Sequence, residues 1–336
     1  MILRILKGFL TAALMGILGF SAWIVPGLYR PVAGPGDPPV LFEAGRGSSA
    51  ALLGRELQDR GMIHDRRVFL AAYRLFFHPE TLKAGDYGLS FPLTTKDVLI
   101  DFSQGRLLLQ TLTIPEGLII EETAEAVIAQ GFLQASDFAE AAQNPDLISA
   151  VDPQAFDMEG YLFPDTYHLS RKATSRAILR MMTGQFLRVF NDDWRQRADE
   201  IGMSVRDVVI LASLIEKETS LERERDVVAS VFHNRLRIGM KLDCDPTIIF
   251  ALKKEGRFTG RLRTRDMRDP TPYNTYVHRG LPPGPICSPG RNSLYAALYP
   301  AETEYFFFVS RNDGSHHFSR TYREHLAAVR KYQLKK

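Results

Sequence analysis

The sequence predicts an α+β protein that begins with one membrane-spanning helix. An apolar run lies near the N-terminus, short strand-like and helix-like segments follow it, and longer helical patterns joined by Pro- and Gly-rich loops begin after residue 107. At 336 residues, the chain is long enough for about two globular domains. Its content of 45% hydrophobic and 24% charged residues is sufficient for folded cores.

The N-terminal segment has the pattern of a membrane anchor. Residues 9–25 are almost entirely apolar, Arg4 and Lys7 precede them, and Pro26 closes the run. A spanning helix needs about 20 residues, and basic residues ahead of it keep the short tail cytoplasmic. A cleaved signal peptide is the alternative, but residues 21–23 (Ser-Ala-Trp) are a poor cleavage site. We therefore expect an uncleaved helix with the rest of the chain exported.

Residues 29–38 are rich in Pro and Gly, which predicts a tether. After it, a strand followed by a helix and a glycine occurs at residues 40–61 and again at 112–131. The two copies are either an internal repeat or a chance likeness of ordinary strand–helix units. Between them we expect a turn into a strand at 82–87, and a helix capped by Thr94 or Thr95 that ends near residue 105.

Beyond residue 107 the apolar spacing predicts mostly helices. The expected helices cover about 121–130, 136–149, 173–199, 205–218, 222–238 and 290–299, and a last helix follows Thr321. Residues 305–309 are strongly β-prone and predict a strand.

Charge and cysteine content exclude several classes of function. The net charge of +3 is too small to indicate nucleic-acid binding, and no base-reading motif accompanies it. Cys244 and Cys287 are too few for a disulfide framework; they either pair or, as we favour, stay as two buried thiols. No spacing indicates a metal site or a cofactor site.

Glu216 lies at the end of an apolar helical run. Residues 204–207 have the pattern of a capping box, and Val205, Val209 and Ala212 recur on the helix face that Glu216 continues. Apolar surroundings would raise the pKa of this carboxyl, which suits a general acid. The alternative is a glutamate whose side chain simply reaches water from the last helical turn.

Three loops combine aromatic and hydrogen-bonding residues. They are residues 159–167, 243–247 and 273–290. Aromatic rings beside Asp, Thr and Asn suit stacking on sugars and hydrogen bonds to hydroxyls. The structural alternatives are a packed turn for the first loop, an Asx turn for the second and a loop covering the core for the third.

Together, several segments resemble the endolytic murein transglycosylase (YceG-like) family. They are Gly-Tyr-Leu-Phe-Pro-Asp-Thr-Tyr at 160–167, Glu-Lys-Glu-Thr at 216–219, Val-Phe-His-Asn-Arg-Leu at 231–236, Asp-Pro-Thr at 245–247, Tyr-Asn-Thr-Tyr at 273–276 and Gly-Leu-Pro-Pro-Gly at 280–284. They occur in the family's order, and the resemblance covers nearly the whole chain.

The resemblance implies a domain order and a location. The expected parts are a cytoplasmic tail and transmembrane helix at 1–28, a linker at 29–38, a LysM-like domain at 39–106 and a YceG-like catalytic domain at 107–336. It also implies a single-pass protein of the cell inner membrane with a periplasmic catalytic domain. Peptidoglycan glycan strands are the implied substrate, and peptidoglycan synthases are the implied protein partners.

The implied reaction is cleavage of the MurNAc-β-1,4-GlcNAc bond without water, which leaves a 1,6-anhydro-MurNAc end. The family's catalytic glutamate corresponds to Glu216, and no cofactor or metal is implied. One carboxyl could suffice, because the sugar's own C6 hydroxyl is the nucleophile and needs only positioning. Glu218 is expected to support the site; the other expected substrate-binding residues are Asp165, Tyr167, Asp245, Thr247, Tyr273 and Asn274.

Two other functions stay open at this stage. A hydrolytic muramidase would need a second carboxylate near Glu216 and would leave reducing ends. A non-catalytic peptidoglycan-binding scaffold would tolerate the loss of Glu216.

Overall fold

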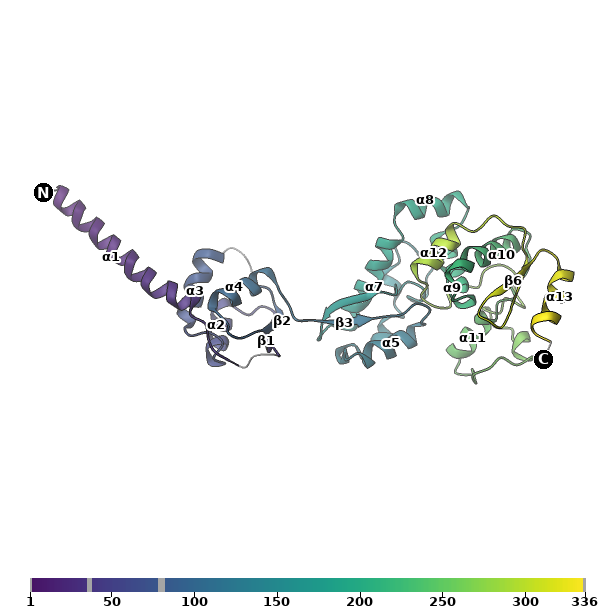
Figure 1. Cartoon of the computed structure of the whole chain (residues 1–336), viewed down its shortest axis with the longest axis horizontal. Coiled ribbons are helices and arrows are strands. Elements are labelled where there is room, and N and C mark those ends of the chain that lie inside the picture. The colour runs from purple at the N-terminus through teal and green to yellow at the C-terminus, as the bar shows by residue number, and fades with distance from the viewer. Residues whose placement is uncertain (1, 35–37, 78–81, 335–336) are drawn as a thin grey trace. The chain divides into compact units, whose positions relative to one another are not determined.

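The computed structural model describes residues 2–34, 38–77 and 82–334. It is α+β, as the sequence predicts: helices dominate, and the strands form small two-stranded sheets. The chain divides into two compact units, one up to Gln110 and one from Thr111 onward (Figure 1).

The first unit begins with helix α1 (Ile2–Tyr29), drawn in purple in Figure 1. Its segment Leu6–Tyr29 is long and apolar enough to cross a membrane, and only 6% of it is buried. The helix continues through Pro26, which closes the apolar run, and ends one residue beyond the predicted bound of residue 28. Ile24 and Leu28 are buried in the core of the first unit, so packing holds the last helical turn in place.

The expected tether after the helix is partly docked. Val32 and Leu93 exchange backbone hydrogen bonds of 2.8 and 3.1 Å. Residues 29–34 therefore belong to the folded unit, whereas residues 35–37 of the expected linker lie outside the described residues.

A two-stranded antiparallel sheet and three helices build the rest of this unit. Strands β1 (Val40–Ala44) and β2 (Gly85–Leu89) pair, and α2 (Ala50–Asp59), α3 (Arg66–Ala72), a π-helical turn (Tyr73–Phe77) and α4 (Thr95–Gln104) surround them. Thr94 caps α4 as predicted. Phe42, Tyr87 and Phe102 are fully buried, and burial of each such ring stabilises the fold by about 1.5–3 kcal/mol.

The second unit is mainly helical. Its helices are α5 (Ile120–Ala129), α6 (Phe138–Ala141), α7 (Ser175–Val189), α8 (Asp192–Glu200), α9 (Val205–Glu218), α10 (Arg225–Arg237), α11 (Asp245–Lys254), α12 (Arg291–Leu298) and α13 (Tyr322–Tyr332). Strands β3 (Leu109–Thr113) and β4 (Thr166–Ser170) form one sheet, and β5 (Phe307–Ser310) and β6 (His316–Ser319) form another. Single 3₁₀ turns lie at Leu133–Ala135, Pro145–Leu147, Glu222–Glu224 and Asp266–Arg268.

Two sequence predictions in this unit are corrected, and one helix was not predicted. The helix expected at 173–199 is two helices, because the Asn191 side chain accepts a hydrogen bond from the Trp194 amide and starts α8. The helix expected at 136–149 is only the short helix α6, followed by the 3₁₀ turn Pro145–Leu147. Helix α11 was not expected; Pro246 lies in its first turn, where its missing N–H costs nothing.

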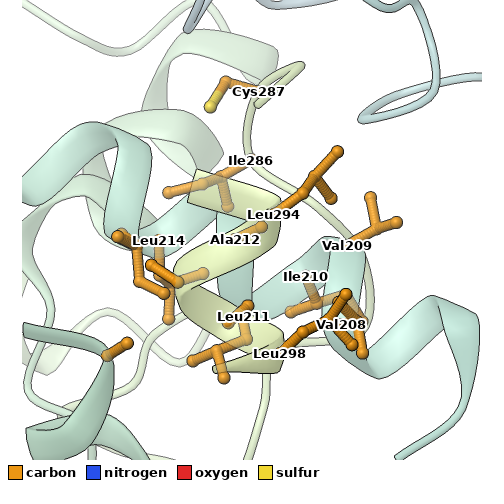
Figure 2. Close-up of a cluster of buried hydrophobic side chains, with 14 of the residues drawn as sticks. Val208, Val209, Ile210, Leu211, Ala212, Leu214, Ile286, Cys287, Leu294 and Leu298 are labelled. Carbon is orange, nitrogen blue, oxygen red and sulfur yellow. The ribbon is translucent and has the colours of Figure 1, made fainter. Parts of the chain in front are cut away.

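Helices α9 and α12 form the centre of the second core (Figure 2). Residues 208–215 of α9 are all buried, and Leu294 and Leu298 of α12 pack against them. The Ser213 hydroxyl accepts a hydrogen bond of 3.0 Å from the Ile286 amide, which fixes the segment leading into α12 along α9. The end of α9 is thereby held close to the start of α12.

Candidate active site

Glu216 lies in the last turn of α9, facing the start of α12, and its side chain is only 7% exposed. Its Oε1 accepts a hydrogen bond of 3.3 Å from the Arg225 guanidinium, and its Oε2 accepts one of 3.0 Å from the Gly290 amide. The helix bounds are as predicted, but the expected apolar surroundings of the carboxyl are wrong: it is held by polar donors.

A second carboxyl, that of Glu116, lies against Glu216. It comes from the loop between β3 and α5, is 44% exposed, and its Oε2 lies 3.5 Å from Nη2 of Arg225. Arg225 is 11% exposed and so contacts both carboxyls from a nearly buried position. Burial and the charge of Glu216 raise the pKa of Glu116, and Arg225 opposes this shift.

Backbone contacts hold Glu116 in place. The Gly117 amide donates to the Ser288 carbonyl and the Ser288 amide donates to the Leu118 carbonyl, both at 2.9 Å. Gly117 has a φ of +80°, a conformation that favours glycine. The Lys217 ammonium donates to the Gly117 carbonyl at 3.1 Å. The loop carrying Glu116 is therefore tied both to α9 and to the segment before α12.

The Glu116 carboxyl lies so close to Gly290 that a larger residue at this position would displace it. A Cβ atom at this position would lie 1.8 Å from Oε1 of Glu116. Its φ of −77° is available to any residue, so the constraint is the neighbouring carboxyl rather than the backbone.

Glu116 and Arg225 were not predicted from the sequence, and Gly290 was predicted only as the last residue of the loop 273–290. Glu116 lies about a hundred residues from Glu216 along the chain, and no spacing rule links them. The local signal for Glu116 was an acidic residue directly before a glycine, in Ile-Pro-Glu-Gly at residues 114–117. Such a segment is equally typical of an ordinary turn.

Glu218 does not join this group. Burial raises the pKa of its carboxyl to about 7, while a hydrogen bond with the Cys244 thiol and the charge of Arg235 oppose the shift. Cys244 and Cys287 are both free and buried. The described contacts of Glu218 reach Cys244, directly before α11, and not Glu216, so its supporting role in the site stays a prediction.

Three expected substrate-binding side chains are buried and bond within the fold. Thr247 is fully buried and donates to the Cys244 carbonyl. Asn274 is fully buried, and its amide donates to the carbonyls of Met267 and Asp269. Tyr167 is 4% exposed and donates to the carbonyl four residues before it. Their printed hydrogen bonds all lie within the fold, so their part in substrate binding stays a prediction.

The other three expected residues are accessible but lie on separate loops. Asp165 is exposed and accepts from Gln185 at 2.7 Å, and Asp245 is exposed and accepts from Tyr276 at 2.7 Å. Tyr273 is half-buried, and its ring packs against a phenylalanine of α11. None of their described contacts reaches Glu216, so their part in substrate binding stays a prediction.

An apolar cavity of about 120 Å³ lies between the end of α9 and helix α11. Lys217 and Lys253 are its charged lining residues; the others are Ile119, Pro246, Ile249, Phe250 and Ile286.

Within the described ranges, no three or more His, Cys, Asp or Glu side chains gather in a way that could hold a metal ion.

Another buried carboxyl, Glu159, is separate from Glu216. It is 3% exposed, and its Oε2 accepts a hydrogen bond of 3.1 Å from the Ile120 amide. Its Oε1 has no partner among the described residues. Burial raises the pKa of Glu159 to about 8, with the Ile120 hydrogen bond opposing the shift.

We expect Glu159 to make stability depend on pH. Above an ordinary pKa of 4.5 the unfolded chain loses a proton that the folded protein keeps, so stability falls as pH rises from there to about 8. The slope is at most about 1.4 kcal/mol per pH unit. Glu159→Gln removes this contribution. Thermal unfolding at several pH values should therefore show that the stability of the variant relative to wild type increases as pH rises. Parallel pH curves for the two proteins would show that Glu159 does not titrate in this way.

Comparison with known proteins extends over most of the chain. Residues 42–331 match the family described as YceG-like. The endolytic murein transglycosylase of Bacillus subtilis (strain 168) is 37% identical over 179 residues, which are 52% of this chain and 48% of the relative. The protein of the same name from Streptococcus pneumoniae serotype 2 (strain D39 / NCTC 7466) is 27% identical over 292 residues, which are 79% of this chain and 53% of the relative.

The chain spans about half the length of these curated relatives. Among solved structures, a 2.6 Å crystal structure of a protein from Listeria monocytogenes, described as yceG-like, is similar with a TM-score of 0.59 and 29% identity. The match covers 86% of this chain and 98% of the Listeria chain.

Proposed function

This chain belongs to the YceG-like family, and from that premise we propose that it is a membrane-anchored lytic transglycosylase that cuts peptidoglycan glycan strands internally. The relatives named endolytic murein transglycosylase support the reaction class. The observation that carries the proposal is the nearly buried carboxyl of Glu216, held between Arg225 and the Gly290 amide beside a partly exposed second carboxyl.

In the proposed reaction Glu216 acts first as an acid and then as a base. Its carboxyl donates a proton to the oxygen that leaves C1 of MurNAc in the MurNAc-β-1,4-GlcNAc bond. The resulting carboxylate accepts the proton of the C6 hydroxyl as that oxygen bonds to C1. The product is a 1,6-anhydro-MurNAc end, and no water is consumed.

The neighbouring groups orient Glu216 for both steps. The Gly290 amide and the Arg225 guanidinium fix its two oxygens, so little reorganisation is needed when charge changes. Arg225 also stabilises the carboxylate form that must accept the hydroxyl proton.

A hydrolytic muramidase is the second candidate, and one observation favours it. Glu116 supplies the second carboxyl that this mechanism needs, and at 44% exposure it is accessible to water. A retaining or inverting hydrolase uses two carboxyl groups flanking the bond. We rank it second because Glu116 shares a guanidinium with Glu216, which places both carboxyls together rather than on two sides of a sugar ring.

A membrane anchor at α1 would hold this reaction close to a membrane. We propose that α1 crosses the cell inner membrane once, with its N-terminal end cytoplasmic and the rest of the chain periplasmic; the apolar span Leu6–Tyr29 supports this. The last turn of α1 is packed into the first unit, which would keep that unit at the membrane surface. A LysM-like identity for residues 39–106 and an association with peptidoglycan synthases remain proposals from family resemblance.

The product ends test the proposal. The full chain in detergent is incubated with purified peptidoglycan, and the released fragments are analysed by mass spectrometry. We expect anhydro-MurNAc ends, which are lighter than reducing ends by one water. Reducing ends would support the muramidase, and binding without cleavage would support a non-catalytic scaffold.

A further inference from the structure

We propose that Glu116 and Glu216 share one proton beside Arg225, and that Glu116 returns this proton to Glu216 when the glycosidic oxygen leaves. The inference rests on the proposed function for its role in the reaction, but the shared proton itself is a property of the resting site. In this arrangement Glu116 is a positioning residue: it holds the proton and acts on the substrate only through Glu216.

The geometry brings two carboxyls to one guanidinium. Nη2 of Arg225 lies 3.3 Å from Oε1 of Glu216 and 3.5 Å from Oε2 of Glu116. Two ionised carboxylates in contact repel each other, and a single cation nearby balances only one of them. A pair of this kind is expected to keep one proton over a wide pH range.

The hydrogen bonds indicate where the proton rests. Both oxygens of Glu216 accept hydrogen bonds, one from Arg225 and one from the Gly290 amide, which suits its ionised form. Glu116 receives the longer contact from Arg225 and is hydrogen-bonded to Glu216, and its other oxygen lies close to Gly290. The raised pKa of Glu116, caused by burial and then by the charge of Glu216, agrees with this placement.

Other charged groups lie near the pair. Lys217 of α9 donates to the Gly117 carbonyl and keeps its positive charge, but it is not among the groups that shift the pKa of Glu116. Glu222, from the turn before α10, adds a negative charge that further raises the pKa of Glu116. Cys287, before α12, keeps its thiol proton because burial raises its pKa well above the ordinary value.

The proton count closes over one reaction cycle. In the resting site Glu216 is ionised and Glu116 holds the shared proton. Glu216 takes this proton from Glu116 and passes it to the leaving oxygen, which breaks the bond from that oxygen to C1. The C6 hydroxyl oxygen then bonds to C1 and gives its proton to the pair. The pair ends with one proton, as it began, and neither water nor another reactant is used.

Glu116→Gln tests the proposal through the pH dependence of cleavage by the full chain. Gln cannot hold the proton, and the Arg225 guanidinium favours the ionised form of the one remaining carboxyl, that of Glu216. We expect the rate at neutral pH to fall about 10- to 100-fold, because the alkaline limb of the pH–rate profile moves down by about one to two pH units. Glu116→Asp should restore part of the rate and of the profile.

Glu125→Gln is the matched control, since Glu125 is an exposed glutamate of the adjacent helix α5. It should leave the rate and the profile unchanged. An unchanged profile for Glu116→Gln would overturn the proposal, and so would a loss of rate without any movement of the alkaline limb, because that would be a structural effect.

Gly290→Ala provides a second variant that leaves both carboxyls in the chain. Its Cβ would lie 1.8 Å from Oε1 of Glu116, so that carboxyl must move away from Glu216. We expect the same downward movement of the alkaline limb with little change in thermal stability. A wild-type profile in this variant would contradict the shared proton.

A measurement that needs no cleavage separates this inference from the proposed function. Infrared difference spectra between wild type and Glu116→Gln, in the full chain without substrate, should show one protonated carboxyl at neutral pH that the variant lacks. Absence of that band would overturn the shared proton even if the wild type is active. Its presence in a protein that does not cleave glycan would leave the shared proton standing and overturn the proposed function.

Discussion

Glu216→Gln is expected to lower the rate of glycan cleavage by about 10²- to 10⁴-fold, the usual contribution of a general acid–base group. Gln keeps the size of the side chain and can still accept the hydrogen bond from the Gly290 amide, but it has no acidic proton to give. The rate of fragment release from purified peptidoglycan measures the effect.

Two controls separate chemistry from folding. Thermal unfolding of Glu216→Gln should match that of wild type within a few degrees, and Glu125→Gln should keep full activity. If Glu216→Gln retained the wild-type rate with normal binding, the acid would have to be another residue, and Glu116 would be the first candidate.

Asp152→Ala is expected to destabilise the second unit by about 3–5 kcal/mol, as removal of one partner from a buried ion pair does. Asp152 is 2% exposed and accepts hydrogen bonds of 2.7 Å from the Tyr161 hydroxyl and 2.6 Å from Arg206. The same guanidinium also donates to the Pro283 carbonyl. Removal of the carboxylate therefore leaves a nearly buried cation and a buried phenol without their partner.

Thermal unfolding of the full chain measures this loss. Asp146→Ala is the matched control, because Asp146 is an exposed aspartate of the same region and its loss should cost less than about 1 kcal/mol. Asp152→Asn keeps a hydrogen-bond acceptor, so its unfolding midpoint should lie between those of Asp152→Ala and Asp146→Ala. Equal midpoints for Asp152→Ala and Asp146→Ala would show that this ion pair contributes nothing.

The elements that could be predicted are those with local signals. The capping box at Ser204 and the apolar stripe of α9 define that helix from Val205 to Glu218, and they place Glu216 in its last turn. The Thr94 cap and Gly105 likewise define α4. Such signals depend on residues three or four positions apart, so a single sequence contains them.

The missed features depend on contacts between distant segments. Arg225 lies only nine residues beyond Glu216, but a break in the helix, which changes the chain's direction, brings it back to that carboxyl. Glu116 arrives through backbone bonds between Gly117 and Ser288. Thr247 also contacts a distant segment, because its hydroxyl lies 3.1 Å from that of Thr275. A single sequence does not show which polar loop residues make such bonds within the fold.

Cleavage in heavy-oxygen water tests the central claim most directly. If the C6 hydroxyl of the sugar is the nucleophile, the new MurNAc ends formed by the full chain carry no heavy oxygen and have the anhydro mass. Heavy oxygen at C1 of the new ends would show that water attacked, which would contradict the transglycosylase account and establish hydrolysis.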